Sequence, residues 1–216
     1  MQGVISKVII DDVVERFKLK QPDLFEKLLY YFCSNIGNRT SLRKLTDFLQ
    51  KQREISPNTV YNYVDMMLKT FAVYNVSRFD WKQARIFDTL KKYYAVDTGI
   101  VNSFDHTTNN YSKLLENIVF LELMRRHNSV YFGELNDGKE IDFIAVNQDK
   151  SAVKYQVTRE LNDANFKREC SAFVSGDQYL DHYDNILLVR NGASVNIDFN
   201  GTAIRQIALL NWLLEV

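Results

Sequence analysis

Two carboxylates and an amide stand out because their residue types could together hold a divalent cation. Glu116 lies in a long, mostly apolar stretch, Asp142 follows a turn signal, and the triplet Gln156-Val157-Thr158 comes next along the chain. Mg²⁺ prefers hard oxygen ligands, usually one or two carboxylates completed by water and phosphate. Glu116 and Asp142 could supply that charge as metal ligands. Gln156 could add only a neutral carbonyl oxygen, and Thr158 provides no cation.

The elements around these residues are predicted to form an α/β (α+β) fold, with a mixed sheet flanked by helices. Asn136-Asp137-Gly138 is a turn signal between two strands. Gln156 and Thr158 share one face of their strand, because alternate strand residues point the same way. The expected elements are a helix over 111–127, strands over 130–132, 140–146 and 152–158, a helix containing Ala164, Phe166 and Phe173, strands over 186–189 and 195–197, and a closing helix through Ile204, Ile207, Leu210, Trp212 and Leu213.

Residues 133–139 match the start of the phosphate-binding pattern GxxxxGK[ST], but the match is incomplete. The next residue is Glu140, so the hydroxyl that would bind Mg²⁺ is missing. A strand rather than a helix is expected to follow, so no helix N-terminus would face the phosphate. The segment is therefore predicted to be a hairpin turn, and ATP is not expected to bind this chain.

The first half of the chain is predicted to contain helices followed by two strands. Pro22 starts one helix and Ser56-Pro57 starts another, since serine caps a helix and proline fits its first turn. Strands are expected over 71–79 and 92–97. The other expected helices cover 4–19 and begin at Ser41. Helix, short helix, sharply capped helix and a two-stranded wing is the order of a winged helix-turn-helix.

A winged helix suggests where DNA would bind. The N-terminal residues of its recognition helix enter the major groove. Basic side chains nearby could contact phosphates. The predicted groove residues are Asn58, Thr59, Tyr61 and Asn62, and the predicted phosphate contacts are Arg43, Lys44, Lys51, Arg53, Arg78 and Lys82. A winged helix can equally serve only as a protein-interaction or spacer module, because an exposed helix face is polar in either case.

The distribution of charge favours an anionic partner for the first half only. The chain has 27 basic and 27 acidic residues, yet residues 1–100 carry a net charge of +5 and residues 101–216 carry −5. This excess is modest, so it permits DNA binding without requiring it.

Other classes of chemistry are not indicated. Cys33 follows an apolar run and is expected in a core, and Cys170 lies too far along the chain for CxxC spacing. The three histidines lack metal-ligand spacing. No apolar run approaches the roughly 20 residues of a membrane span. A reduced, cytoplasmic protein without a membrane partner is therefore expected.

The residues at 116, 142 and 156–158 resemble the motif of the PD-(D/E)xK, or restriction-endonuclease-like, superfamily. That motif has a glutamate on a helix, an aspartate on a strand, and Glu, Asp or Gln two positions before a lysine on the next strand. The chain is also similar to the C-terminal region of a group of prokaryotic AAA-type ATPases. This similarity covers nearly all 216 residues and is carried by residues 115–123 (LENIVFLEL), 59–63 (TVYNY) and 92–99 (KYYAVDTG).

The resemblance implies a division into three parts. Residues 1–20 would be a linker helix from an upstream ATPase module, residues 21–100 a winged helix-turn-helix, and residues 101–216 a restriction-endonuclease-like domain. Two departures matter. The chain has no Walker A loop, so the ATPase module is absent from it, and Thr158 stands where the superfamily has its lysine. That lysine orients the attacking water and stabilises developing negative charge, and Lys154 on the same strand face is too far away to replace it.

Three functions follow as hypotheses. The first is a DNA- or partner-binding region of a larger AAA-type ATPase, non-catalytic or weakly catalytic. The second is a Mg²⁺-dependent DNA endonuclease, with Glu116 and Asp142 as metal ligands and Gln156 as an auxiliary group. The third is a protein-interaction module that docks an ATPase or another subunit and has no affinity for nucleic acid. The missing lysine favours the first hypothesis over an active enzyme.

Overall fold

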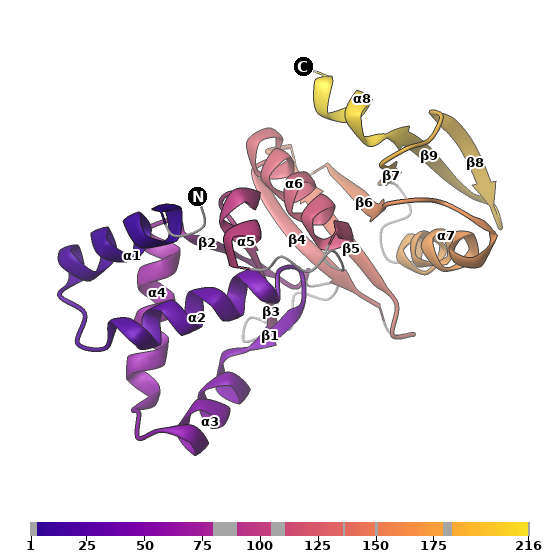
Figure 1. Ribbon diagram of the computed structural model, residues 1–216. Coiled ribbons are helices and arrows are strands. Elements are labelled where there is room, and N and C mark those ends of the chain that lie inside the picture. Colours follow the sequence, from indigo (N-terminus) through magenta and orange to yellow (C-terminus); the bar gives the residue numbers. More distant parts are fainter. Residues whose placement is uncertain are drawn as a thin grey trace. The chain divides into compact units, whose positions relative to one another are not determined.

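The computed structural model describes residues 4–79, 90–104, 111–135, 137–149, 151–178 and 183–215. These residues form eight helices and nine strands, including one large mixed sheet (Figure 1). The predicted mixed α/β class is therefore confirmed. The chain divides into two compact units, the first made of Met1–Val76 with Phe87–Thr108 and the second of Ser77–Ile86 with Asn109–Val216.

The described part of the first unit is mostly helical. Its three strands form a small sheet in the order β1-β3-β2, with β1 antiparallel to β3 and Arg39 opposite Lys92. The two strands expected after the capped helix are thus neighbours, whereas β1 was not predicted. The elements are α1 (Val4–Phe17), α2 (Pro22–Ser34), β1 (Arg39–Ser41), α3 (Leu42–Gln52), α4 (Pro57–Lys69), β2 (Val73–Ser77, its last residue counted with the second unit), β3 (Leu90–Ala95) and α5 (Thr98–Phe104).

Local signals explain where the helices of the first unit begin. The Ser41 side chain accepts the Lys44 N–H at 3.4 Å before α3, and the Ser56 side chain accepts the Thr59 N–H at 3.2 Å before α4. Pro57 occupies the first turn of α4. Each cap satisfies an N–H group that the helix itself cannot, so the predicted starts of these two helices are confirmed.

The core of the first unit lies mainly between α2 and α4. Val13 of α1 is also buried in this core, so the helix predicted to be a linker packs into the unit. Cys33 is fully buried here, as predicted. The other buried residues that α2 and α4 contribute are Leu24, Phe25, Leu28, Leu29, Phe32, Val60, Tyr63, Val64 and Met67.

The second unit is built around a six-stranded sheet in the order β4-β5-β6-β7-β9-β8. The pairs β4–β5, β5–β6 and β8–β9 are antiparallel, whereas β6–β7 and β7–β9 are parallel. The sheet is therefore mixed, as predicted. Its elements are α6 (Tyr111–Arg126), β4 (Ser129–Glu134), β5 (Glu140–Val146), β6 (Ala152–Thr158), α7 (Asp163–Asp177), β7 (Asp184–Val189), β8 (Val195–Phe199), β9 (Thr202–Ala208) and α8 (Leu209–Leu214).

Two long helices pack against this sheet, α6 over β4, β5 and β6, and α7 over β5, β8 and β9. Phe120 of α6 stacks on Phe143 of β5, with ring centroids 6.3 Å apart. Helix α7 packs against Ile141 and Ile144. A Cβ at Gly176 of α7 would stand 2.6 Å from Ile141 Cδ1, so a larger residue there would have to push that side chain aside.

The closing helix predicted through Ile204 and Ile207 is wrong in its first half. Residues Thr202–Ala208 form strand β9, and the helix α8 begins only at Leu209. Thr202, Ile204 and Gln206 are buried while the residues between them are exposed, which is the period of a strand. Parallel pairing with β7 on one side and antiparallel pairing with β8 on the other hold the segment extended.

None of the described helices is both long and apolar enough to cross a membrane.

Candidate functional site

A bulge in β5 sets the position of Asp142. Tyr131 of β4 lies opposite Ile144, whereas Gly133, two residues on, lies opposite Ile141. Between these two pairs, β5 advances by three residues while β4 advances by two. Such a bulge disrupts the local ladder and redirects side chains. Here Asp142 lies within the bulge, next to the point where β5 separates from β6.

Asp142 and Gln156 meet where the β5–β6 ladder ends. The last regular pair of the ladder is Phe143 with Tyr155. Beyond it the Asp142 N–H donates to Gln156 Oε1 at 2.7 Å, and the Val157 N–H donates to Asp142 Oδ2 at 2.8 Å. The side chains thus replace two main-chain bonds of the sheet. We call these residues, Asp142, Gln156 and Val157, the strand junction.

Helix α7 adds two charged residues that sequence reasoning missed. Gln156 Nε2 donates to Glu169 Oε2 at 3.2 Å, and Arg168 donates to the other oxygen of the Glu169 carboxylate. The hydrogen bond that Arg168 donates to Glu169 and the negative charge of Glu169 raise the pKa of Arg168, and the charge of Asp142 adds to this effect. Glu169 lies three residues after Phe166 and four before Phe173, on the apolar side of the helix. A glutamate among the apolar positions of a predicted helix was the sequence signal that could have pointed to Glu169.

Thr158, which stands where the resembled motif has a lysine, carries no charge. The Thr158 hydroxyl donates to the Glu160 carbonyl at 3.0 Å, and Thr158 is buried. Lys154 is fully buried and forms an ion pair with Asp177 at the end of α7. The ammonium group of Lys154 is therefore engaged by the Asp177 carboxylate.

Glu116 is buried on α6, the helix that covers β5 and β6. Lys113, three residues earlier, donates to its carboxylate at 3.0 Å. Contacts of α6 with both strands place Glu116 on an element adjacent to the junction. A direct hydrogen bond brings Asp142 together with Gln156.

Two oxygens of the strand junction are engaged by the main chain. The oxygens Asp142 Oδ2 and Gln156 Oε1 already accept main-chain N–H groups. Among the residues that the structure describes, no group of three or more His, Cys, Asp or Glu is arranged to hold a metal ion. At the junction, the hydrogen bonds of Asp142 and Gln156 close the end of the β5–β6 ladder.

The first unit presents a polar face along α4. Asn58, Tyr61 and Asn62 are exposed, and Thr59 is half-buried beside the Ser56 cap. Arg43 and Lys44, in the first turn of α3, are exposed as well. A cleft of about 300 Å³ is lined by residues of α3, α4, β2 and β3, among them Arg43, Tyr61 and Lys91. Two cations, two tyrosines (Tyr61 and Tyr93) and the carboxylate of Asp65 thus border a single cleft.

Among the predicted phosphate contacts, Arg78 and Arg53 are engaged by carboxylates. Arg78 lies in the second unit, where it donates to Glu134 at 2.6 Å and is mostly buried. Lys82 lies outside the described residues. Arg53 joins α3 to the start of α2 by donating to Asp23 and Gln21, both at 2.8 Å. Its guanidinium is therefore committed to holding the helices together.

Comparison with known proteins places the chain in a family. Residues 1–111 match a family described as "Domain of unknown function (DUF8612)". The chain belongs to this family. The DUF8612 match takes in α1 to α5 and ends where α6 begins. Arg43, Lys44 and the α4 face lie inside the matched range, and the strand junction lies outside it.

Two relatives align over both units of the chain. A Haemophilus influenzae protein described as "Uncharacterized protein" is 28% identical over 218 residues, which cover 100% of this chain and 52% of the relative. "Uncharacterized protein MJ1544" of Methanocaldococcus jannaschii is 27% identical over 223 residues, covering 99% of this chain and 49% of the relative. The DUF8612 chain thus spans about half the length of these relatives. No solved structure matches it.

Proposed function

We propose that this chain is the DNA-binding region of a larger AAA-type ATPase, with a winged helix-turn-helix in its first unit and a restriction-endonuclease-like second unit that does not cleave DNA. The observation that carries the proposal is the exposed start of α4 together with the exposed Arg43 and Lys44 of α3, of which Arg43 lines one cleft with Tyr61 of α4. A helix presented by its N-terminal turn and flanked by cations suits the major groove and its phosphates.

The topology of the first unit supports the winged-helix part of the proposal. Its elements run α2, β1, α3, α4, β2, β3, and the strands form one small sheet. In this arrangement α4 is the recognition helix and β2–β3 is the wing. Asn58 and Asn62 would offer amides to base edges, and Tyr61 would reach the groove beside Arg43.

The strand junction supports a second unit without cleavage activity. The order α6, β4, β5, β6, α7, β7 agrees with the superfamily resemblance. Cleavage would need a bound cation and a group that stabilises the negative charge of the transition state. At the junction Thr158 replaces the lysine, and the oxygens of Asp142 and Gln156 hold main-chain N–H groups.

The length of the relatives supports a place in a larger protein. The curated relatives are about twice as long as the aligned region. The remaining half of each relative is long enough for an ATPase module. The similarity of this chain to the C-terminal region of AAA-type ATPases implies such a module. A partner ATPase in a separate chain is the corresponding alternative.

The proposal is tested by binding of the purified chain to a fluorescent 20-base-pair duplex, comparing two charge-matched double variants. Arg43→Ala with Lys44→Ala removes two cations from the proposed face. Arg16→Ala with Lys20→Ala removes two exposed cations elsewhere in the first unit. We expect the first pair to weaken binding about tenfold and the second pair about twofold or less. No binding by the wild-type chain at low salt, or equal losses in both variants, would refute DNA binding by this face.

Cleavage is tested separately on plasmid and branched DNA. We expect no Mg²⁺- or Mn²⁺-dependent nicking by the wild-type chain. Nicking that disappears in Asp142→Ala would instead establish the endonuclease hypothesis.

A further inference from the structure

Two arginines lie next to each other at the carboxyl ends of two parallel strands of the second unit. The β6–β7 ladder ends with Thr158 opposite Val189, and the Arg190 N–H still donates to the Thr158 carbonyl at 3.1 Å. Arg159 and Arg190 therefore continue the register of the two strands, on one face of the sheet. Ligands of open sheets with parallel strands bind outside the carboxyl ends of those strands.

Both guanidinium groups lie over the same aromatic ring. The Cζ atom of Arg190 is 4.5 Å from the centroid of the Tyr111 ring, and that of Arg159 is 5.4 Å from it. The two cations are thus no farther apart than the sum of these two distances. Tyr111 is the first residue of α6 and is 36% exposed, so the group is open to solvent. We call Tyr111, Arg159 and Arg190 the arginine cluster.

The arginine cluster carries more positive than negative charge. Arg159 has an ion pair with Glu160 at 3.6 Å, but the two side chains are 53% and 62% exposed, so water screens the pair. Within the described part of the chain, the half-buried Arg190 side chain forms no hydrogen bond and no ion pair. Two like charges on one ring repel each other, and an anion that contacts both would reduce this repulsion.

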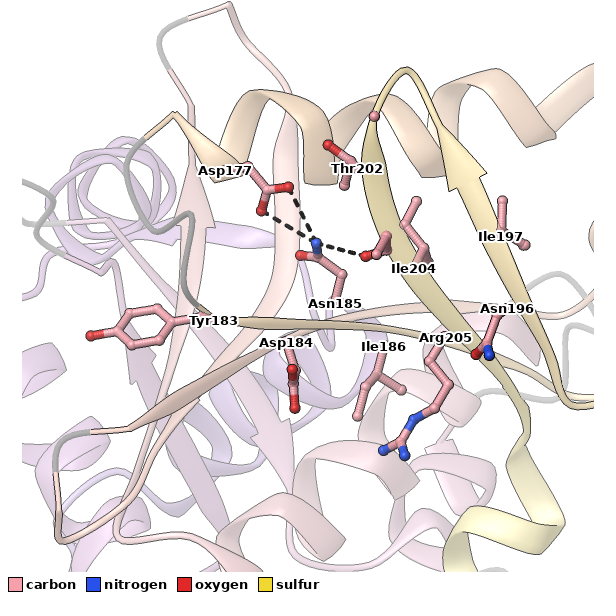
Figure 2. A pocket seen from close by; sticks show the side chains of 12 residues that line it. Asp177, Tyr183, Asp184, Asn185, Ile186, Asn196, Ile197, Thr202, Ile204 and Arg205 are labelled. Atoms are coloured by element: carbon pink, nitrogen blue, oxygen red, sulfur yellow. Dashed lines mark hydrogen bonds between the residues drawn. The ribbon is translucent and has the colours of Figure 1, made fainter.

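The opposite end of β7 differs from this end in its charges. A cleft of about 500 Å³ there is bordered by Asp177, Asp184 and Arg205 (Figure 2). Asp177 is already ion-paired with Lys154 and accepts a hydrogen bond from the Asn185 amide. This cleft therefore presents both signs of charge and selects neither, whereas the arginine cluster presents mainly cations.

The two guanidinium groups match a phosphate monoester. Such a group has about two negative charges at neutral pH and three acceptor oxygens. A carboxylate has one charge and two oxygens, which a single guanidinium fork can satisfy. A phosphate monoester can therefore accept from Arg159 and Arg190 together, whereas a carboxylate gains little from the second cation.

We propose that the arginine cluster binds the terminal phosphate of a nucleotide, either free or at the end of a nucleic-acid strand. In this site the two guanidinium groups donate to the phosphate oxygens, and the Tyr111 ring holds both of them in place. The phosphate site itself does not depend on the α4 face. Only the choice of a nucleotide as the carrier of the phosphate rests on the proposed DNA binding.

The site is tested by calorimetric titration of the whole chain with small anions at constant ionic strength. Inorganic phosphate and adenosine 5′-monophosphate carry the proposed group, and acetate is the carboxylate control. We expect saturable binding of both phosphates with a dissociation constant of about 1 mM or below. Binding of acetate should be weaker by about tenfold or more.

Two strands with the same sequence identify the carrier of the phosphate. One strand has a 5′-phosphate and the other a 5′-hydroxyl, and both are titrated into the Arg43→Ala, Lys44→Ala variant so that the α4 face contributes little. Tighter binding of the phosphorylated strand than of adenosine 5′-monophosphate indicates a strand end, and the reverse order a free nucleotide. A phosphoserine peptide that binds more tightly than both would overturn the assignment to a nucleotide.

Matched variants locate the binding. Arg190→Gln removes the half-buried cation and should weaken phosphate binding by about tenfold or more. Arg159→Gln should weaken it about threefold, because Glu160 already screens this charge. Glu160→Gln removes the competing carboxylate and should strengthen binding about twofold. Arg205→Gln makes the same substitution at an exposed arginine beside the start of β7 (Figure 2), and should change affinity by about twofold or less.

Three results would overturn the proposal. They are no saturable binding of either phosphate, equal affinity for acetate, and equal losses in Arg190→Gln and Arg205→Gln. If Arg190→Gln does not fold, the exposed positions decide, and unchanged affinity in both Arg159→Gln and Glu160→Gln then refutes the site. A failure of the α4 face to bind DNA would leave the titrations with inorganic phosphate unchanged, so the two proposals fail separately.

Discussion

Replacing Gln156 by leucine tests whether the strand junction is a structural device. The substitution keeps the volume nearly constant and removes both hydrogen bonds of the amide. The Asp142 N–H loses its acceptor, bonded at 2.7 Å, and the Glu169 carboxylate loses a donor at 3.2 Å. A neutral hydrogen bond contributes about 1 kcal/mol and one to a charged group about 1.5–3 kcal/mol. We therefore expect the free energy of unfolding of the second unit to fall by about 2–4 kcal/mol.

The assay is urea unfolding followed by tryptophan fluorescence. The chain has two tryptophans, so a Trp81→Phe background leaves Trp212 as the sole reporter, and Trp212 is buried in the second unit. Gln148→Leu, at an exposed position of the same unit, is the matched control and should change stability by less than about 0.5 kcal/mol. If Gln156→Leu behaves like this control, the junction does not depend on the amide and the structural explanation of Gln156 is wrong.

Three further outcomes are expected from buried or ion-paired groups. Phe120→Ala should destabilise the second unit by about 3–5 kcal/mol, against little change for Met124→Ala on the exposed side of α6, as measured by the same unfolding assay. Burial raises the pKa of the Cys33 thiol to about 12, so at pH 8 it should react with a thiol reagent only after unfolding; rapid reaction of native protein would contradict its burial. Hydrogen bonds from Arg125 and the next arginine lower the pKa of Glu122 to about 2. Because this folded pKa lies below the ordinary value, the ion pairs should stabilise the protein at pH 7, by about 1–2 kcal/mol relative to Glu122→Gln. That difference should vanish as the pH falls from about 4.5 to 2; a constant difference would argue against the ion pairs.

Local chemistry explains which elements could be predicted from the sequence. Serine caps and a first-turn proline mark the starts of α3 and α4, and the strands over 140–146 and 152–158 have the predicted bounds. In each case the signal lies within a few residues of the element.

The elements that were missed depend on partners far along the chain. Strand β1 has only three residues and is held by pairing with β3, about 50 positions later. The short helix α5 was not predicted either. The strand β9 was mistaken for helix because Ile204, Ile207 and Leu210 repeat every three residues, a spacing that fits a helix until the pairing with β7 and β8 is known.

Only the part of the candidate site that lies on neighbouring strands could be predicted from the sequence. Asp142 and Gln156 lie on successive antiparallel strands, so the hairpin alone brings them close. Glu169 and Arg168 reach the junction only through the placement of α7 over the sheet, which depends on packing at positions such as Gly176. The bulge at Asp142 could not be predicted from the sequence either, because it is a difference in register between two strands.

The central claim, that the start of α4 and the cations of α3 bind duplex DNA, is tested most directly by the salt dependence of binding. Each phosphate contact contributes about −0.9 to the slope of log K against log salt concentration. Relative to wild type, the slope of the Arg43→Ala, Lys44→Ala variant should become shallower by about 2 units, while that of the Arg16→Ala, Lys20→Ala variant stays unchanged. Identical slopes for wild type and the α3 variant would contradict the proposed DNA interface.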